Sequence, residues 1–224
     1  RMRILDLTTF QLQQVGEGGV PRSGLHTDLN DFAPRLGASS DLTGSGQWLL
    51  RGGYGIFYDS GTLIENSALY FNPPYWTLSL WVPNPVPVSL ANPFPAGRAI
   101  APRAAINTLD PNMRTPYAQE GTAGVDGVVK GTTINARYVA SYGYDLARKR
   151  NINQAFPGPG PIDARRPIPT LGDVLLVEST STSTYHALDI GVSRRTRRGI
   201  WMRAAYTLSN SMDDTSAFLA TDGD

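Results

Sequence analysis

Apolar residues alternate with small or polar residues over long stretches of this sequence. In residues 184–195 the even positions carry Leu188, Ile190 and Val192, whereas the odd positions carry alanine, aspartate, glycine and serine. Three further segments alternate in the same way, at 48–58, 131–143 and 199–211. A period of two is the repeat of a β-strand, whose successive side chains point to opposite faces. The alternation therefore predicts an all-β fold.

The connections between the predicted strands alternate between short and long. Short turns near 43–47, 129–131 and 196–199 contain glycine, which supplies the positive φ that tight hairpins need. They give three hairpins, at 34–58, 117–142 and 183–211. Long proline-rich loops, 59–116 and 143–182, join one hairpin to the next. In an antiparallel up-and-down meander, all short turns then lie at one end and all long loops at the other. This asymmetry is typical of a transmembrane β-barrel.

We therefore expect three parts along the chain. Residues 1–27 form an N-terminal segment, either a further strand or an extension. Residues 28–214 form the β-barrel region. Residues 215–224 form a mobile acidic tail. This reading places the chain in the bacterial outer membrane, with outer-membrane lipid around it.

The two faces of the predicted strands differ as lipid and an enclosed lumen would require. One face is apolar, and the other is small and sparsely charged, with only 17% charged residues in the whole chain. The exposed face of a soluble antiparallel sheet is usually richer in charge. We predict that the polar face lines the lumen. Its charged members are Arg51, Asp126, Arg137, Asp189 and Arg203.

Aromatic residues fall near both ends of the predicted strands. Trp48 and Trp201 follow short turns, and tyrosines flank the long loops at 58, 117, 142 and 185. Membrane barrels carry such aromatic girdles at both interfaces. A preference of aromatic residues for strands in general would give a similar pattern.

The composition argues against several classes of function. With a formal net charge of +1, no overall field attracts nucleic acid, and we expect no such partner. The absence of cysteine excludes disulfides, thiolate metal sites and a cysteine nucleophile. Only two histidines are present, His26 and His186, so we expect no metal site and no cofactor. No apolar run reaches the roughly 18 residues of a transmembrane helix. The arginines of 194–198 are expected to form a solvated turn.

Four stretches resemble the Oar-like TonB-dependent outer-membrane receptors, in the same order along the chain. They are DLNDFAPRLGASSDLTGSGQWLLRGGYGIFYD, TPYAQEGTAGVDG, YVASYGYDLARKRNINQ and STYHALDIGVSRRTRRGIWMRAAYTLSNSMDD. Together they cover most of residues 28–214.

This resemblance implies a barrel of many strands around a plug, driven by an inner-membrane energy-coupling protein. Such receptors import bulky nutrients or take part in protein export, so the implied ligand is a glycan, a siderophore or a peptide. The sequence contains no recognisable plug, TonB-contacting box or signal peptide. The few strands predicted here cannot close a barrel of that circumference. We therefore expect part of a receptor barrel, or a shortened relative that closes differently, and a partnership with the energy-coupling protein only where a plug is present.

Two alternatives remain at this level. A soluble β-rich hydrolase of glycans or esters would need two carboxylates near each other, and the loop or strand-start candidates are Glu65, Glu120 and Glu178. A carbohydrate-binding or adhesive module would use the proline-stiffened aromatic residues Tyr75, Trp76 and Trp81. The same three aromatics are the predicted ligand contacts of a receptor. No motif in the sequence identifies a catalytic residue.

Overall fold

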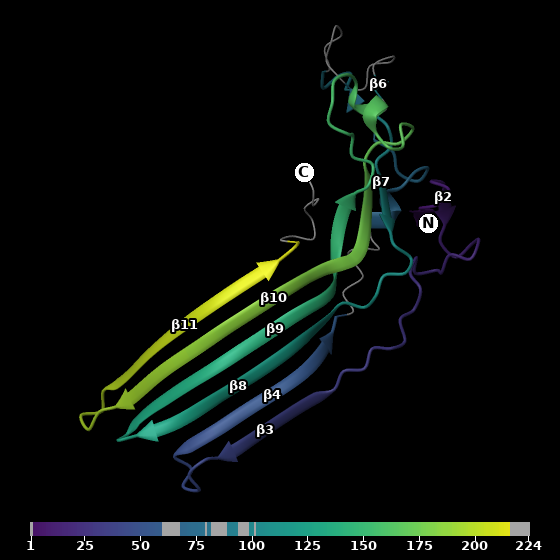
Figure 1. Ribbon diagram of the computed structural model, residues 1–224. Helices are drawn as coiled ribbons and strands as arrows, with labels where there is room; N and C mark the ends of the chain where they lie inside the picture. Colours follow the sequence, from purple (N-terminus) through teal and green to yellow (C-terminus); the bar gives the residue numbers. More distant parts are fainter. Residues whose placement is uncertain are drawn as a thin grey trace.

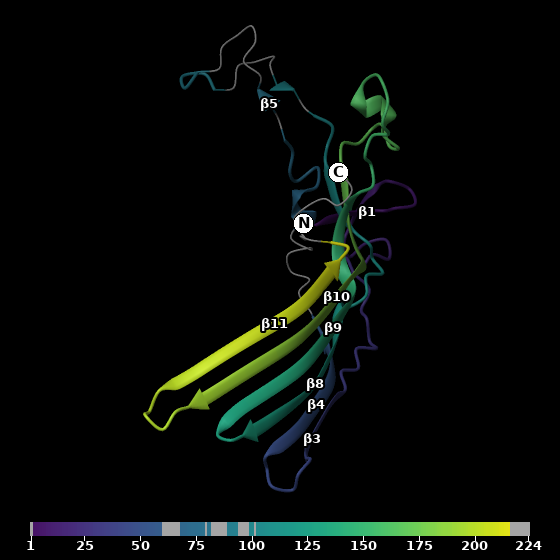
Figure 2. The same ribbon diagram turned by 60° about the vertical axis from the view of Figure 1, so that its left-hand side comes forward.

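The computed structural model describes residues 2–59, 68–78, 80–81, 89–93, 99–100 and 102–215. These residues form an open, single-layer antiparallel sheet and a compact unit at one end of it (Figure 1). The turned view shows the same sheet with nothing packed over its long strands (Figure 2). Among the described residues, no helix is long and apolar enough to cross a bilayer.

The sheet is a meander in which neighbours in sequence are mostly neighbours in space. Its order is β11-β10-β9-β8-β4-β3, and every pair along this path is antiparallel. The strands are β3 (Arg35–Asp41), β4 (Trp48–Tyr58), β8 (Tyr117–Val129), β9 (Thr132–Asn151), β10 (Val174–Arg195) and β11 (Trp201–Asp213). The predicted all-β antiparallel fold is confirmed. Within the described residues the sheet does not close, and β3 and β11 are its two edges.

The short turns lie together at one end of the sheet, as the alternation of loop lengths predicts (Figure 1). The β8–β9 turn consists of Lys130 and Gly131, whose φ angles of 47° and 75° are the pair that a two-residue hairpin requires. Gly199 has φ 81° in the β10–β11 turn. The longer connections meet at the opposite end (Figures 1 and 2). This end is called the long-loop end below.

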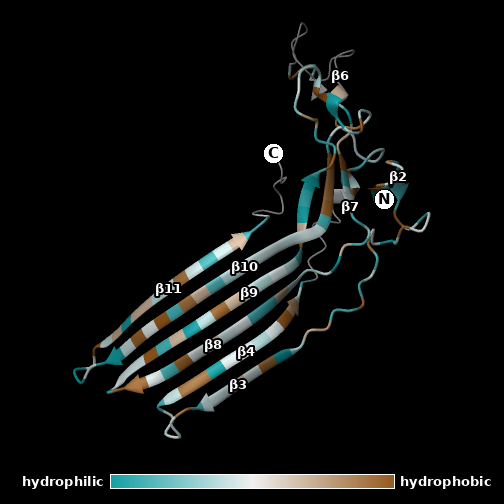
Figure 3. Ribbon diagram, viewed as in Figure 1, coloured by the Kyte–Doolittle hydropathy of each residue, from teal (hydrophilic) through white to brown (hydrophobic). Residues whose placement is uncertain are grey.

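The register places the alternating residues on two distinct faces. Leu188 lies opposite Tyr138 on one side and Leu208 on the other, and all three share one face. Asp189 lies opposite Arg137 and Thr207 on the other face. Figure 3 shows the resulting bands of hydrophobic and hydrophilic residues along the strands. Cross-strand partners point to the same side of a sheet. The alternation in each strand therefore gives the whole sheet one apolar and one polar face.

The apolar face is not covered by any described part of the protein. Met202, Tyr206 and Leu208 are 52%, 63% and 61% exposed, and Leu188, Ile190 and Val192 are also exposed. A water-soluble sheet of this size would bury such residues in a second layer. The arrangement therefore agrees with side chains that face lipid rather than a protein core.

The aromatic residues of the predicted girdle divide between the two faces of the sheet. Tyr58 and Tyr117 lie on the apolar face at the long-loop end and form a row with Tyr144, which was not predicted, with ring centroids 5.4 Å and 5.2 Å apart. Trp201 and Tyr185, in contrast, have odd positions in β11 and β10, and the register puts them on the polar face. They cannot belong to a girdle on the apolar side, because a shift of one residue reverses the face.

The second and third hairpins are longer than predicted. β9 continues to Asn151 and β10 begins at Val174, so the connection is residues 152–173 rather than 143–182. Register shifts between Ser179 and Ser183 accompany a positive φ of 53° at Asp145. Such bulges bend a strand, and Figure 1 shows β10 bending at this level. The extended ribbon beyond the bend carries β7 (Ile106–Leu109), which pairs with β10 in parallel.

A compact unit, here called the loop-end unit, surrounds this ribbon. It contains β1 (Arg3–Leu5), β2 (Leu12–Gln14), the short 3-10 helix η1 (Ala68–Phe71) and β7. Two buried clusters hold these elements together. They are Ile4, Leu69, Leu109, Met113 and Val177, and Leu5, Ile106 and Val174. The predicted loop 59–116 thus supplies η1, β7 and the small hairpin of β5 (Leu80–Trp81) and β6 (Ala99–Ile100). A second 3-10 helix, η2 (Ile162–Arg165), lies in the β9–β10 connection.

Candidate functional site

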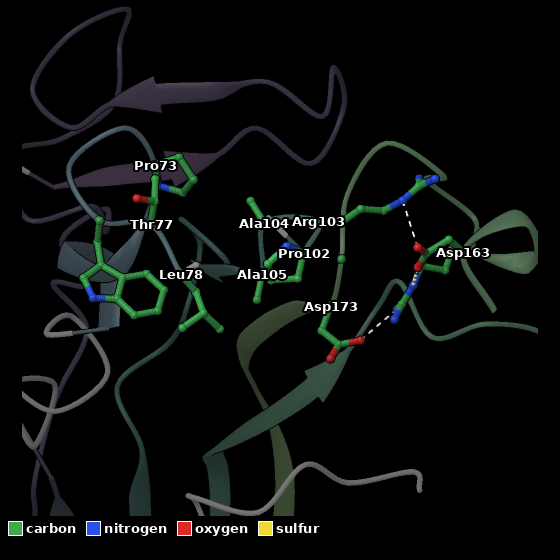
Figure 4. Close-up of a pocket in the computed structure, with 12 residues that line it drawn as sticks. Pro73, Thr77, Leu78, Pro102, Arg103, Ala104, Ala105, Asp163 and Asp173 are labelled. Carbon is green, nitrogen blue, oxygen red and sulfur yellow. Dashed lines mark hydrogen bonds and ion pairs between the residues drawn. The ribbon is translucent and has the colours of Figure 1, made fainter. Parts of the chain in front are cut away.

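A cavity of about 630 Å³ lies at the long-loop end, between segments far apart in the sequence. Residues 73–78 lie along one side, 102–105 along another, and the β9–β10 connection supplies the rest (Figure 4). Its volume is within the range of small-ligand sites, which is about 300–1,000 Å³. It is the candidate site for a ligand.

One wall of the cavity is apolar and stiff. Pro73, Trp76, Leu78 and Pro102 contribute to it. The ring of Trp76 is 42% exposed and meets Phe71 edge to face, with centroids 6.0 Å apart. Such an aromatic pair fixes the orientation of the indole. Trp76 therefore presents a preset aromatic surface to the cavity.

The opposite wall consists of paired charges. Arg103 Nε lies 3.0 Å from Asp163 Oδ2, and Arg166 Nε lies 3.1 Å from Asp163 Oδ1. Arg166 also places its Nη1 2.7 Å from Asp173 Oδ1. Two guanidinium groups and two carboxylates thus form one chain of ion pairs, visible in Figure 4. This wall has many donors and acceptors but no net charge.

Asn153 fixes the connection that carries these charges. Its side chain is fully buried, its Nδ2 donates to the carbonyls of Ile168 and Gly172 at 3.0 Å and 2.7 Å, and its Oδ1 accepts the N–H of Ile168 at 2.7 Å. A buried amide that satisfies several backbone groups makes an irregular loop rigid. Arg166 adds a further bond, from its Nη1 to the carbonyl of Asn153 at 2.8 Å. The polar wall is therefore preorganised.

The ion pair with Arg166 influences the pKa of Asp173. Burial alone would raise the pKa of Asp173, but hydrogen bonds from Arg166 and Asn151 outweigh it and hold the pKa below its usual value. The same contact with Asp173 raises the pKa of Arg166. A carboxyl with a lowered pKa is a poor general acid near neutral pH. Asp173 is therefore suited to accepting hydrogen bonds rather than to donating a proton.

The predicted aromatic contacts are only partly brought together. Trp76 lines the cavity, whereas Tyr75 is half exposed beside it. Trp81 lies in β5, and its side chain lies outside the described residues. None of these three has a tested role, so their part in ligand binding stays a prediction.

The predicted lumen residues share one face of the sheet. Arg51 Nε lies 3.4 Å from Asp126 Oδ2, and Asp189 accepts a hydrogen bond of 2.6 Å from Thr207 Oγ1. Arg137 lies opposite Asp189, and Arg203 lies opposite Ser193 on the same side. The grouping agrees with the sequence pattern. That this face lines a lumen stays a prediction.

Of the three carboxylates considered for a hydrolase, the two that the structure describes, Glu120 and Glu178, do not form a catalytic pair. Glu120 lies opposite Ser141 of β9, whereas Glu178 lies opposite Arg148, seven positions further along the same strand. At about 3.3 Å per residue this is roughly 20 Å, far beyond the 5–9.5 Å of a glycosidase pair. Glu178 is engaged by Arg150, with contacts of 3.0 Å and 3.2 Å. Glu65 lies outside the described residues.

Sequence reasoning missed the polar wall. Asp163 and Arg166 are three residues apart, a spacing that brings side chains together on a helical turn, and η2 begins there. This local signal was available within the proline-rich stretch. The contacts from Arg103 and to Asp173 had no such signal, because they depend on how separate loops pack. Among the described residues, no group of three or more histidine or acidic side chains could hold a metal ion.

An open antiparallel sheet with one apolar and one polar face, short turns at one end and folded loops at the other defines an outer-membrane barrel segment. The family model for the outer membrane beta barrel domain matches residues 1–224, and the chain belongs to this family. The expected location in the bacterial outer membrane is confirmed with it.

Two solved structures are similar to the chain. The siderophore receptor PirA from Pseudomonas aeruginosa is 11% identical with a TM-score of 0.47, and the match covers 81% of this chain and 28% of that one. The outer membrane transporter YddB from Escherichia coli is 13% identical with a TM-score of 0.49, covering 80% and 20%. The chain therefore spans about a quarter of the length of these proteins. No curated protein matches it significantly.

Proposed function

We propose that this chain is the part of an outer-membrane receptor or transporter barrel that binds a bulky ligand at its long-loop end. Long loops of such barrels are extracellular, so the cavity there would be the first surface that a ligand meets. The observation that carries the proposal is the preorganised cavity between Trp76 and the paired charges of Arg103, Asp163 and Arg166.

The two walls indicate the chemistry of the ligand. The apolar wall suits a flat apolar surface, and the polar wall offers donors and acceptors without net charge. A strongly anionic ligand would have to break existing ion pairs before it could use Arg103 or Arg166. The cavity therefore favours a neutral ligand with one apolar face and many hydrogen-bonding groups. A glycan or a peptide fits this description better than an anionic siderophore.

Passage of the ligand through the barrel would follow binding at the long-loop end. In receptors of the class that the sequence resembles, a plug and an inner-membrane energy-coupling protein drive passage through the barrel. We propose that the present residues supply the binding rim and part of the wall of such a barrel. The polar face of the sheet, with Arg51 and Asp126 paired upon it, would then line the passage.

The test compares two tryptophan variants of the full chain. Neutral oligosaccharides, short peptides and ferric siderophores are titrated, and binding is measured by calorimetry. Trp76→Ala is expected to lower the affinity for the ligand that binds about 30-fold, since a central aromatic contact is worth about 2 kcal/mol. Trp201→Ala, at the other end of the sheet and 62% exposed, is the matched control and should bind normally. Equal affinities of the two variants would reject the cavity as the binding site.

A further inference from the structure

A cluster of cations occupies the end of the sheet opposite the cavity. Four arginines surround the β10–β11 turn and are exposed. They are Arg194, Arg195, Arg197 and Arg198, and are called the arginine turn below. Lys130 adds a further cation in the β8–β9 turn, which lies beside it. The third short turn, between β3 and β4, carries a carboxylate instead. Asp41 there accepts the N–H groups of Thr43 and Gly46, at 3.0 Å and 2.6 Å. A chain with a net charge of only +1 thus has a local excess of positive charge here.

The arginines are not needed to form the turn. Thr196 donates its N–H to the carbonyl of Ile200 at 2.8 Å, and its Oγ1 accepts the N–H of Ile200 at 3.2 Å. Gly199 closes the turn with a bond of 3.0 Å to the carbonyl of Thr196. Within the described residues, no carboxylate forms an ion pair with any of the four arginines. Like charges packed in one turn repel each other, so the cluster lowers the stability of the isolated chain unless an anion binds.

The position of the cluster relative to the apolar face indicates which anion. Arg194 lies opposite Met202 and continues the stripe of Ile190 and Val192 on the apolar face. It therefore lies at the short-turn end of this stripe. In a bilayer that covers the apolar face, hydrocarbon would give way to headgroups at this level. A long arginine side chain can lay its stem on apolar surface and extend its charge to that level. Guanidinium groups bind phosphate oxygens in a bidentate manner.

We propose that the arginine turn is a docking site for the phosphates of anionic phospholipids, in the membrane leaflet on the short-turn side. Short turns of outer-membrane barrels are periplasmic, so the site faces the periplasmic leaflet. The bound headgroups offset the repulsion between the arginines and fix the depth of the β10–β11 hairpin in the bilayer. This role is independent of the ligand cavity, which lies at the other end of the strands.

The test measures lipid bound to the full chain. The protein, folded in detergent, is incubated with phosphatidylglycerol or phosphatidylcholine of the same acyl chains, and bound lipid is counted by native mass spectrometry. Phosphatidylglycerol is expected to bind preferentially, and less so at high salt, because salt screens exposed charges. The variant R197Q/R198Q should lose about fivefold in affinity per arginine. R197K/R198K keeps the charge and should retain most of the binding.

The matched control is R22Q/R114Q, which removes two exposed arginines from the long-loop end. It should bind phosphatidylglycerol as the unaltered chain does. Equal retention of phosphatidylglycerol by R197Q/R198Q and the unaltered chain would overturn the proposal. So would equal binding of the two lipids. Capture of a polyglutamate peptide without preference for phosphatidylglycerol would indicate an acidic protein partner, and would overturn it as well.

Discussion

Apolar residues are exposed on the long strands and buried in the loop-end unit. On the sheet, Leu188 and Leu208 are exposed, and nothing described covers them. In the loop-end unit, Leu5, Leu109 and Val174 are at most 1% exposed. The difference reflects the solvent that each region meets. Water drives the loop-end unit to bury its apolar groups within the protein, whereas lipid accepts the apolar face of a barrel as it is.

The two regions also satisfy their backbone groups differently. Apart from the bulge between β9 and β10, the long strands pair regularly with their neighbours, so side chains are not required to satisfy the backbone there. The loop-end unit has few regular strand pairs. Buried side chains form hydrogen bonds with its backbone groups instead. Asn72 accepts the N–H of Asn107 at 2.8 Å and donates to the carbonyl of Arg3 at 2.7 Å. Thr108 accepts the N–H of Leu5 at 3.1 Å. Polar side chains thus satisfy backbone groups in the loop-end unit. In the sheet, residues of the same types lie on the polar face.

The largest effect on stability is expected from a substitution that creates a cavity in the core of the loop-end unit. Leu109→Ala removes a side chain that is 1% exposed and should destabilise the unit by about 2–5 kcal/mol. Leu36→Ala, at a position 74% exposed on the apolar face of β3, should cost far less. Hydrogen exchange at the amides of β7 measures the difference. Similar losses at the two positions would show that the two regions do not differ in the way described.

A charge on each side of β11 tests which face meets lipid. Leu208 and Ser209 are adjacent but point to opposite faces. In a bilayer Leu208→Arg should cost about 2–4 kcal/mol, as expected for arginine near the midplane of a barrel. Ser209→Arg should change stability by much less, because it lies on the polar face. Denaturant unfolding from lipid vesicles measures both variants, and a larger loss for Ser209→Arg would reverse the assignment of the faces.

The smallest effect is a pH dependence of stability that is confined to the β9–β10 connection at the long-loop end. The pKa of Asp173 is lowered in the folded protein, so its contribution to stability is fully present above its ordinary pKa of 3.8. That contribution is lost as the pH falls through the lower folded value. The pair is partly exposed, so the effect should stay below about 1 kcal/mol.

Asp173→Asn should remove this part of the acid sensitivity. Hydrogen exchange at the amide of Ile168, which Asn153 holds, measures the opening of the β9–β10 connection as the pH falls. The long strands should show no matching change between the two proteins. An identical acid response in Asp173→Asn would mean that other carboxylates control the connection.

The sequence by itself determined the two faces, the hairpin pairing and the end at which the short turns lie. These features follow from alternation and turn residues, which are local, as the stripe of Leu188, Ile190 and Val192 shows. Local signals could not set the ends of β9 and β10, because beyond the bulge these strands stay paired while β10 also pairs with β7, a parallel strand from a remote loop. The true ends of these strands were therefore misplaced.

Only the tertiary structure decided the site. Trp76 was expected to contact a ligand, but its opposite wall comes from Arg103, Asp163 and Asp173, which lie up to about a hundred residues away. Side chains so distant in sequence meet because separate loops pack on the buried core around Leu109 and Val174. No period or short motif encodes that packing. Alternation determines to which face of the sheet a side chain points. A cavity depends on where separate loops lie in space.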